Sequence, residues 1–73
     1  MTGRPRKQSV TLRGHRTSVS LEEAFWAELK RLAEAEGKSL NEKVAEIDAA
    51  RGVRSGLAAA IRVHVLEAVK AGR

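Results

Sequence analysis

The hydrophobic periodicity of the chain changes once, at Leu21, and this change constrains the fold more than any other feature. Between residues 8 and 21, apolar and polar side chains alternate, as they do in β-strands with one buried face. After Leu21, apolar residues recur three and four positions apart, which is the spacing of amphipathic helices. We therefore expect a mainly α fold that begins with a short β element.

The alternating segment can fold back on itself as a hairpin. Apolar side chains stand at even positions in 8–12 and at odd positions in 16–21. A two-residue turn at Arg13-Gly14 brings both sets to one face of the ribbon. The sequence thus predicts a strand at 16–21 and allows an extra N-terminal strand at 8–12. The opposite face would carry Ser9, Thr11, Arg16, Ser18 and Ser20.

Three helices are expected after the strand, at 21–36, 39–50 and 56–70. Gly37 supplies a stop for the first helix. Ser55 can cap the third helix, which then spans 55–70 with its cap included. The apolar surface of the third helix spreads over more than one stripe, which is typical of a helix packed on two sides or of one that awaits a partner.

Two of these helices begin with the pattern of a capping box. Ser20 precedes Glu23 by three residues, and Ser39 precedes Glu42 in the same way. In this motif the serine hydroxyl accepts a hydrogen bond from a first-turn N–H, and the glutamate accepts one from the serine backbone. We expect both serines to be N-caps.

The core available to the chain is small. It has 73 residues, no cysteine and nineteen apolar side chains larger than alanine, and a chain of this size buries only about 60% of its unfolded surface. Without disulfides or a zinc cluster, a second copy of the chain is the remaining means of stabilisation, so we expect a homodimer. Trp26 would lie at the dimer seam or under the third helix. The expected core and dimer residues are Val19, Leu21, Phe25, Trp26, Leu29, Leu32, Leu40, Val44 and Ile47.

The formal charge of +5 lies entirely at the N-terminus. Residues 1–21 hold five cations and no acid, whereas 22–73 hold nine of each sign. An unopposed basic segment is typical of chains that bind a polyanion, although a solubilising tail has the same composition. A membrane partner is disfavoured because this segment has no large apolar face and no run approaches the ~18 residues of a span. We expect a flexible basic arm at 1–7 and one domain at 8–73.

Several segments together resemble the ribbon-helix-helix superfamily, the Arc/MetJ/CopG type of DNA-binding dimer. They are the strand RTSVSL, the helix EEAFWAELKRLAEAEG and the turn GKSLNEKV, which cover about 16–50. SVTLRGHRTSVSLEEAFW and AEIDAARG extend the likeness to a small bacterial subfamily predicted to bind DNA. The resemblance implies a homodimeric transcription regulator, a repressor, that binds double-stranded DNA without cofactor or metal. Because no apolar run approaches a membrane span or a signal-peptide core, we expect a cytoplasmic protein.

The same resemblance implies which residues contact DNA. Strands from two subunits enter the major groove together in this family, so Arg16, Ser18 and Ser20 would face base edges, where arginine can bond guanine bidentately. The N-terminus of the second helix would face phosphate, because its N–H groups and dipole favour an anion. The implied phosphate contacts are Lys38, Ser39 and Asn41, and the basic residues Arg4, Arg6, Lys7 and Arg13 would join them.

Two features depart from this family. A hairpin in each subunit gives a four-stranded sheet about 19 Å across at ~4.8 Å per strand, against a major groove about 12 Å wide. Either the outer strands splay and grip the backbone, or this face has another role. The third helix is the second departure, and its Val63, Leu66 and Val69 would be exposed for a protein partner. The alternative function is therefore a protein interaction module.

Catalysis is not indicated by any residue pattern. The sequence has no general acid/base pair, no nucleophile constellation and no glycine-rich phosphate loop. His15 and His64 are far apart in the sequence and have no cysteine to complete a metal site. We expect neither an enzyme nor a metal centre.

Overall fold

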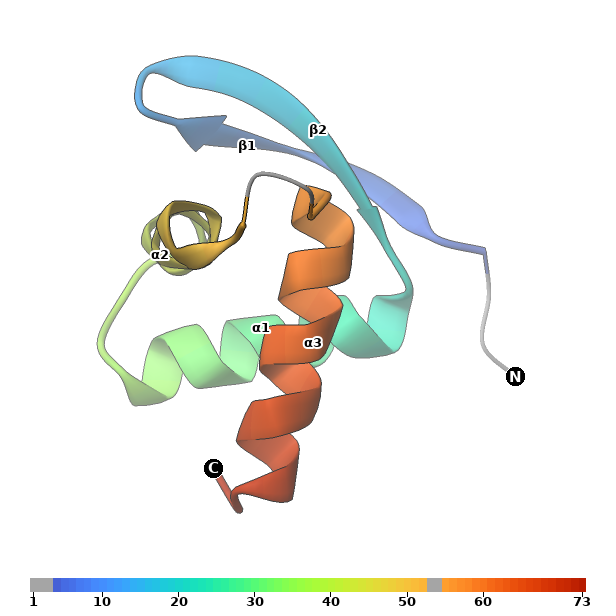
Figure 1. The fold of residues 1–73 in the computed structure, drawn as a ribbon, viewed down its shortest axis with the longest axis vertical. Helices are drawn as coiled ribbons and strands as arrows, with labels where there is room; N and C mark the ends of the chain where they lie inside the picture. Colours follow the sequence, from blue (N-terminus) through green and yellow to red (C-terminus); the bar gives the residue numbers. More distant parts are fainter. Residues whose placement is uncertain (1–3, 53–54) are drawn as a thin grey trace.

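The chain folds into a β-hairpin followed by three helices. This description comes from a computed structural model and covers residues 4–52 and 55–73. The elements are β1 (Arg6–Leu12), β2 (His15–Leu21), α1 (Glu23–Ala35), α2 (Leu40–Ala50) and α3 (Leu57–Lys70). The hairpin lies as a curved ribbon across one side of the helices (Figure 1). The expected mainly α fold with a short β element is confirmed.

The hairpin has the register that the change of parity predicts. Leu12 pairs with His15, Val10 with Thr17, and the ladder continues to Arg6 opposite Leu21. Arg13 and Gly14 have φ values of 52° and 80°, the two positive values of a type I′ turn, whose twist matches that of the strands. The extra N-terminal strand therefore exists and begins two residues earlier than expected. Arg6 and Lys7, expected in a flexible arm, lie in this strand, and residues 1–3 of that arm lie outside the described residues.

The end of α1 and the start of α2 follow their local sequence signals. Gly37 has a φ of 69°, and Lys38 N–H donates to the Ala33 carbonyl at 2.8 Å, which is the long hydrogen bond of a Schellman motif. The Ser39 hydroxyl accepts from Glu42 N–H at 3.1 Å, while the Glu42 carboxylate accepts from Ser39 N–H at 2.7 Å. The predicted helix stop and this capping box are both confirmed.

The other two predicted caps are wrong. The N-cap of α1 is Glu22, without a side-chain cap, because Ser20 is still part of the strand and pairs with Lys7. The N-cap of α3 is Gly56, also without a side-chain cap, so Ser55 stays outside that helix. The first helix begins at 23 instead of 21, since strand pairing holds the backbone extended through Leu21. The second begins at 40 instead of 39 because Ser39 is its N-cap, and the third begins at 57 instead of 55 or 56 because Gly56 is its N-cap.

All five elements contribute to one apolar core. Every expected core residue belongs to it, with Phe25 and Leu40 partly buried at its margin. Side chains of α3 complete the core within a single chain. From the small number of apolar residues, we had expected a second copy of the chain to supply this packing. The Trp26 indole N–H donates to the Arg6 carbonyl at 2.9 Å and so ties α1 to the start of β1. The buried cluster consists of Val10, Val19, Leu21, Trp26, Leu29, Leu32, Val44, Ile47, Ile61, Val65 and Ala68.

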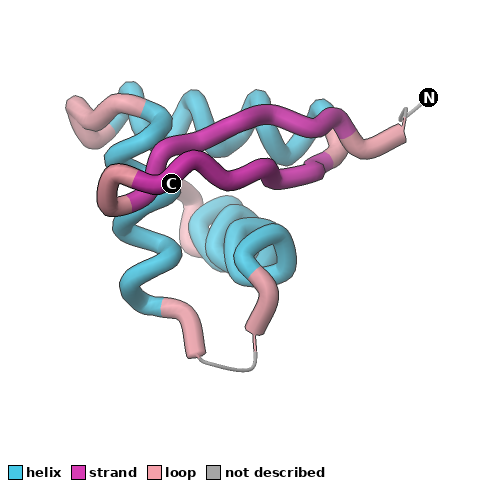
Figure 2. The backbone as a smooth tube through the Cα atoms, turned by 90° about the horizontal axis from the view of Figure 1, so that it is seen from above, coloured by secondary structure: helices cyan, strands magenta, loops and turns pink. Residues whose placement is uncertain are grey.

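The helices are arranged so that the hairpin remains on the outside. The strands contact α2 through β1 and α3 through β2, while α1 packs against the other two helices. Viewed from above, both strands run side by side over the helices (Figure 2). One face of the hairpin is thus packed and the other is turned to solvent.

Candidate nucleic-acid interface

The solvent face of the hairpin consists only of basic and hydroxyl side chains. Three directly opposed pairs make it up, and all six side chains are exposed. Neither an acidic nor an apolar side chain lies among them. We call this surface the hairpin face; its pairs are Lys7 with Ser20, Ser9 with Ser18, and Thr11 with Arg16.

The orientation of this face is fixed by burial on the opposite side. Val10, Val19 and Leu21 are 2%, 3% and 0% exposed. Because side chains alternate along a strand, a slip of one residue would bury the hairpin face and expose these three apolar residues. Burial of the opposite side therefore keeps Arg16, Ser18 and Ser20 together on the surface. The alternation of apolar and polar residues in the sequence predicts this arrangement.

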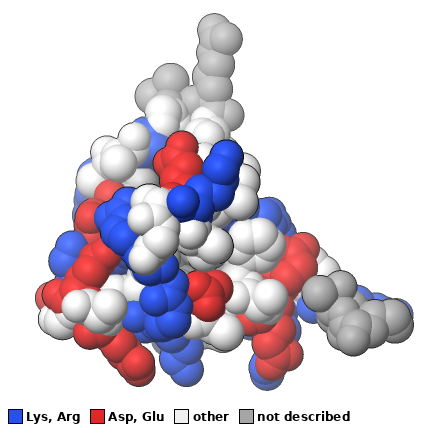
Figure 3. Space-filling view, turned by 90° about the horizontal axis from the view of Figure 1, so that it is seen from below, with Lys and Arg blue, Asp and Glu red and all other residues white. Residues whose placement is uncertain are grey.

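The cations around the hairpin face differ in their neighbours. Within residues 4–52 and 55–73, none of the ion pairs involves Lys7, Arg13 or Arg16. Arg6 pairs with Glu23 at 3.0 Å, but both side chains are more than 60% exposed, so the pair is weak and screened by salt. The helical side of the molecule instead shows basic and acidic side chains interspersed (Figure 3). The basic excess expected from the sequence thus gathers on and beside the hairpin.

The start of α2 carries the three other predicted phosphate contacts, and each already has a partner. Lys38 Nζ forms ion pairs with Glu46 and with Glu36, the latter at 3.4 Å. The Ser39 hydroxyl is the cap described above, and Asn41 Oδ1 accepts from Thr11 N–H at 3.3 Å. The hydrogen bond to Glu46 raises the pKa of Lys38 and lowers that of Glu46. The structure brings the three residues together, but a phosphate there would compete with these contacts.

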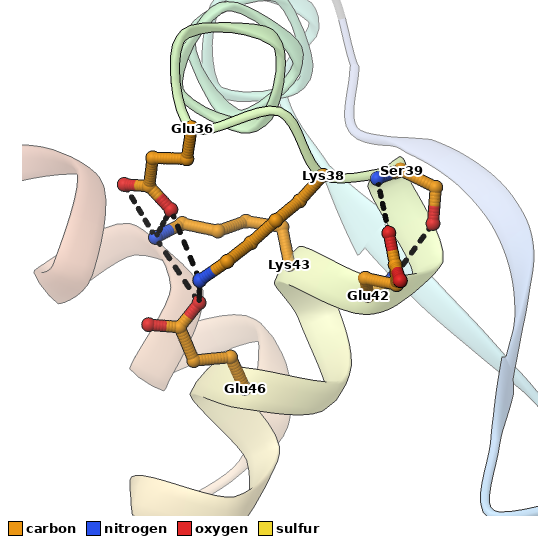
Figure 4. Close-up of polar contacts among 6 residues, drawn as sticks. All are labelled: Glu36, Lys38, Ser39, Glu42, Lys43 and Glu46. Atoms are coloured by element: carbon orange, nitrogen blue, oxygen red, sulfur yellow. Dashed lines mark hydrogen bonds and ion pairs between the residues drawn. The ribbon is translucent and has the colours of Figure 1, made fainter.

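A buried lysine beside this helix start was not predicted from the sequence. Lys43 is 1% exposed, and its Nζ lies 2.9 and 3.0 Å from the two oxygens of Glu36. This hydrogen bonding lowers the pKa of Glu36. We call Glu36, Lys38, Lys43 and Glu46 the corner cluster (Figure 4).

A signal for Lys43 was present in the spacing of α2. It follows Leu40 by three residues and precedes Ile47 by four, which places it on the buried stripe of the helix. A lysine at such a position needs a carboxylate partner, because an unpaired buried charge is costly. Glu36, at the end of α1, is that partner.

The third helix leaves apolar side chains in solvent, as expected. Val63, Leu66 and Val69 are 54%, 56% and 48% exposed. Val63 also lines an open hollow of about 270 Å³ between α2 and α3, next to His64. We call Val63, Leu66 and Val69 the α3 patch; it is separate from the hairpin face.

The histidines show no sign of metal binding in the part of the chain that the structure describes. His15 is exposed beside the turn, and His64 is partly buried on α3. Burial lowers the pKa of His64, and the positive charge of Lys43 adds to this effect. Among the described residues, no group of three or more potential ligands could hold a metal ion. None of the helices in the described part of the chain is long and apolar enough to cross a membrane.

Comparison with known proteins agrees with this architecture. No curated protein and no solved structure matches the chain significantly. A family model described as a ribbon-helix-helix domain matches residues 5–69, which include the hairpin, α1, α2 and nearly all of α3. The chain therefore belongs to the ribbon-helix-helix domain family, whose members are typically DNA-binding transcription regulators and not enzymes.

Proposed function

We propose that this protein is a sequence-specific DNA-binding transcription regulator, which acts as a homodimer through an antiparallel β-ribbon in the major groove. The observation that carries the proposal is the composition of the hairpin face, where two cations and four hydroxyl groups are exposed without an acid. Hydroxyl groups can donate to or accept from base edges, and arginine can bond guanine. The base contacts in this proposal are Arg16, Ser18 and Ser20.

The phosphate contacts come chiefly from cations at the two ends of the hairpin. Arg13 lies at the turn, and Arg6 and Lys7 lie at the start of β1, with Arg4 just before it. Because each strand has seven residues, the two groups of cations are separated by roughly 20 Å. Cations placed in this way can reach phosphates on both sides of the bases that the centre of the ribbon reads.

The start of α2 is a second phosphate site in this proposal. Lys38, Ser39 and Asn41 can turn to a phosphate only by sharing or giving up their present partners. We therefore assign them a smaller share of the affinity than the hairpin cations.

Regulation would follow from occupancy of the DNA. A homodimer would bind two related half-sites that mirror its two-fold symmetry. Bound at a promoter in the bacterial cytoplasm, it would act as a repressor by covering DNA that the transcription machinery needs. The family, whose members typically bind DNA as dimers, supports this assembly.

The proposal is tested by selection from random duplexes, followed by Arg16→Ala. We expect a sequence preference, and the variant should lose about 1–3 kcal/mol of affinity for the preferred duplex and less for random DNA. Lys70→Ala is the matched control, because Lys70 is an exposed cation in the last turn of α3, and that end of α3 lies away from the hairpin (Figure 1). A selection that yields no preferred sequence would refute the proposal.

The α3 patch favours a second candidate function, that of a protein interaction module. Three large apolar side chains, each about half exposed, lie along one helix, and such patches often mark contact surfaces. Light scattering of the wild type and of Leu66→Glu tests this candidate. A smaller mass for the variant assigns the patch to the homodimer, whereas equal masses with unchanged DNA binding leave the patch for another protein.

A further inference from the structure

The dimer proposed above places the two strands of each hairpin at different distances from its two-fold axis. Leu12 and His15 flank the two-residue turn, and the pair at this position is hydrogen-bonded, with bonded and non-bonded pairs alternating beyond it. The backbone N–H and C=O groups of Arg16, Ser18 and Ser20 therefore point away from β1, toward a partner strand. When β2 pairs with β2 of the second copy, β1 becomes the outer strand on each side.

Only the two inner strands of this sheet fit between the walls of the major groove. At ~4.8 Å per strand, the two β2 strands lie about 2.4 Å from the two-fold axis, and the two β1 strands lie about 7.2 Å from it. Each wall of a groove about 12 Å wide lies about 6 Å from its centre. Each β1 strand would therefore lie over the sugar-phosphate backbone of one DNA strand.

The exposed side chains of β1 on the hairpin face are all hydrogen-bond donors. They are the ammonium group of Lys7 and the hydroxyl groups of Ser9 and Thr11. Phosphate oxygens accept hydrogen bonds, and lysine, serine, threonine and backbone N–H groups are common donors to them. By the register given above, the backbone N–H groups of Lys7 and Ser9 point away from β2, along the outer edge. The outer strand can thus donate to phosphates from its side chains and from its edge.

Contacts with the helices hold β1 in place at both ends. Near the turn, Val10 is 2% exposed, and the Thr11 N–H donates to Asn41 Oδ1 at 3.3 Å. At the start of the strand, the Trp26 indole N–H donates to the Arg6 carbonyl at 2.9 Å. The donors of β1 are therefore ordered before DNA binds, which reduces the entropy lost on binding.

The contact with Asn41 also joins β1 to the start of α2. Because Asn41 Oδ1 accepts from the Thr11 N–H, its NH2 group is the part that can donate to a phosphate. The strand and the helix start lie on the same side of the hairpin, since α2 packs against β1. Together they can contact neighbouring phosphates of one DNA strand.

We propose that β1 is a phosphate-binding strand, in which Lys7, Ser9 and Thr11 of each copy contact the DNA backbone at the wall of the groove while β2 reads the bases. This inference rests on the DNA-binding function proposed above. It assigns the hydroxyl groups of Ser9 and Thr11 to affinity and not to specificity. Arg16, the arginine of the hairpin face, lies on the inner strand, where its guanidinium can bond a guanine edge.

The first test compares the same change on the two strands. Ser9 and Ser18 oppose each other in the hairpin, so Ser9→Ala and Ser18→Ala remove the same group from neighbouring positions. We expect Ser9→Ala to weaken binding to the selected duplex and to random duplexes by the same factor, about three- to tenfold. Ser18→Ala should weaken binding to the selected duplex and leave the affinity for random DNA nearly unchanged.

A second pair of variants on β1 extends this test. Thr11→Val should behave as Ser9→Ala does. Gln8→Ala is the control, because Gln8 is exposed on the same strand but faces the other way, and it should bind as the wild type does. A loss confined to the selected duplex in Ser9→Ala and Thr11→Val would show that β1 reads bases. Unchanged affinities in both variants would show that β1 does not contact DNA, and either result would overturn the inference.

The second test removes charge from the DNA instead of donors from the protein. Neutral methylphosphonates replace the phosphates of the selected duplex one at a time, and the positions that weaken binding of the wild type mark its phosphate contacts. At the phosphate that Lys7 contacts, we expect the substitution to lose its effect in Lys7→Ala, because the variant already lacks that contact. If every position keeps its full effect in Lys7→Ala, the inference is wrong.

The outcomes separate this inference from the proposed function. If Arg16→Ala lowers the sequence preference while Ser9→Ala and Thr11→Val change neither affinity, the inference fails and the DNA-binding function stands. If the wild type selects no sequence, both fail. If the two β1 variants lower both affinities equally while Ser18→Ala lowers the preference, β1 is the phosphate-binding strand.

Discussion

The hairpin face and the corner cluster both hold two cations, yet their surroundings are opposite. In the corner cluster, Lys38 and Lys43 each lie within 4 Å of two carboxylates. Among the described residues, no ion pair involves Lys7 or Arg16 of the hairpin face. The net charge of a segment therefore does not decide what a cation can bind. The carboxylates that the fold brings to the cation decide it.

The largest expected effect comes from placing a lysine on the buried side of β2 instead of on its exposed side. Val19→Lys places a charge in the core, where it costs several kcal/mol against a total stability of roughly 5–15, so the variant should be unfolded by circular dichroism. Ser18→Lys, one residue away on the hairpin face, should remain folded and bind random DNA more tightly. If the Val19→Lys variant remained folded, burial of the packed face would not be what anchors the hairpin.

Replacing Lys43 should lower the free energy of unfolding more than replacing Lys38. Lys43→Ala should lower the free energy of unfolding in urea by about 2 kcal/mol or more, because it leaves a void among packed groups. Lys43→Met keeps most of the packed volume and should stay within about 1.5 kcal/mol of the wild type. Equal stability of Lys43→Ala and the wild type would mean that the corner cluster does not hold α1 to α2.

The salt dependence of DNA binding should distinguish the two regions. For Lys7→Ala and Arg13→Ala, the slope of log affinity against log salt should fall by up to about 0.9 for each phosphate that a subunit no longer neutralises. Lys38→Ala should change the slope less, since Lys38 is paired with Glu46. A larger change for Lys38→Ala would place the main phosphate contact at the start of α2.

The smallest expected effect is the pH dependence of the corner cluster. Ion pairing lowers the pKa of Glu36 and of Glu46 below their ordinary value of 4.5. Their contribution to stability is therefore fully present above that value and is lost as the pH falls through the lowered values. Urea unfolding between pH 7 and pH 3 measures it. Glu36→Gln should flatten the acid limb, and an unchanged limb would argue against the ion pair with Lys43.

Features encoded by neighbouring residues could be predicted from the sequence. The parity change around Arg13-Gly14 predicts the hairpin register and its solvent face, and Ser39 with Glu42 predicts the start of α2. The apolar surface of the third helix spreads over more than one stripe in the sequence, and this predicts the α3 patch. Each of these signals depends on periodicity or on a motif of a few residues.

Features that depend on distant partners could not be predicted in the same way. Ser20 has the motif of a cap, but its pairing with Lys7 keeps it in the strand. Lys38 and Asn41 match a phosphate site by motif, yet Glu46 and Thr11 occupy them in the folded chain. Arg62 reaches the edge of β2 across 42 residues of sequence, a contact for which the sequence contains no local signal.

The central claim is that the hairpin face is the main DNA-binding surface, and that the start of α2, with Lys38 of the corner cluster, contributes less. Titration of the labelled protein with its selected duplex, followed by amide chemical shifts in NMR spectra, measures this most directly. We predict the largest shift changes at Lys7, Ser9, Thr11, Arg16, Ser18 and Ser20, with smaller changes at Lys38 and Lys43. Shift changes confined to α2 or α3, with those of both strands unaltered, would contradict the account.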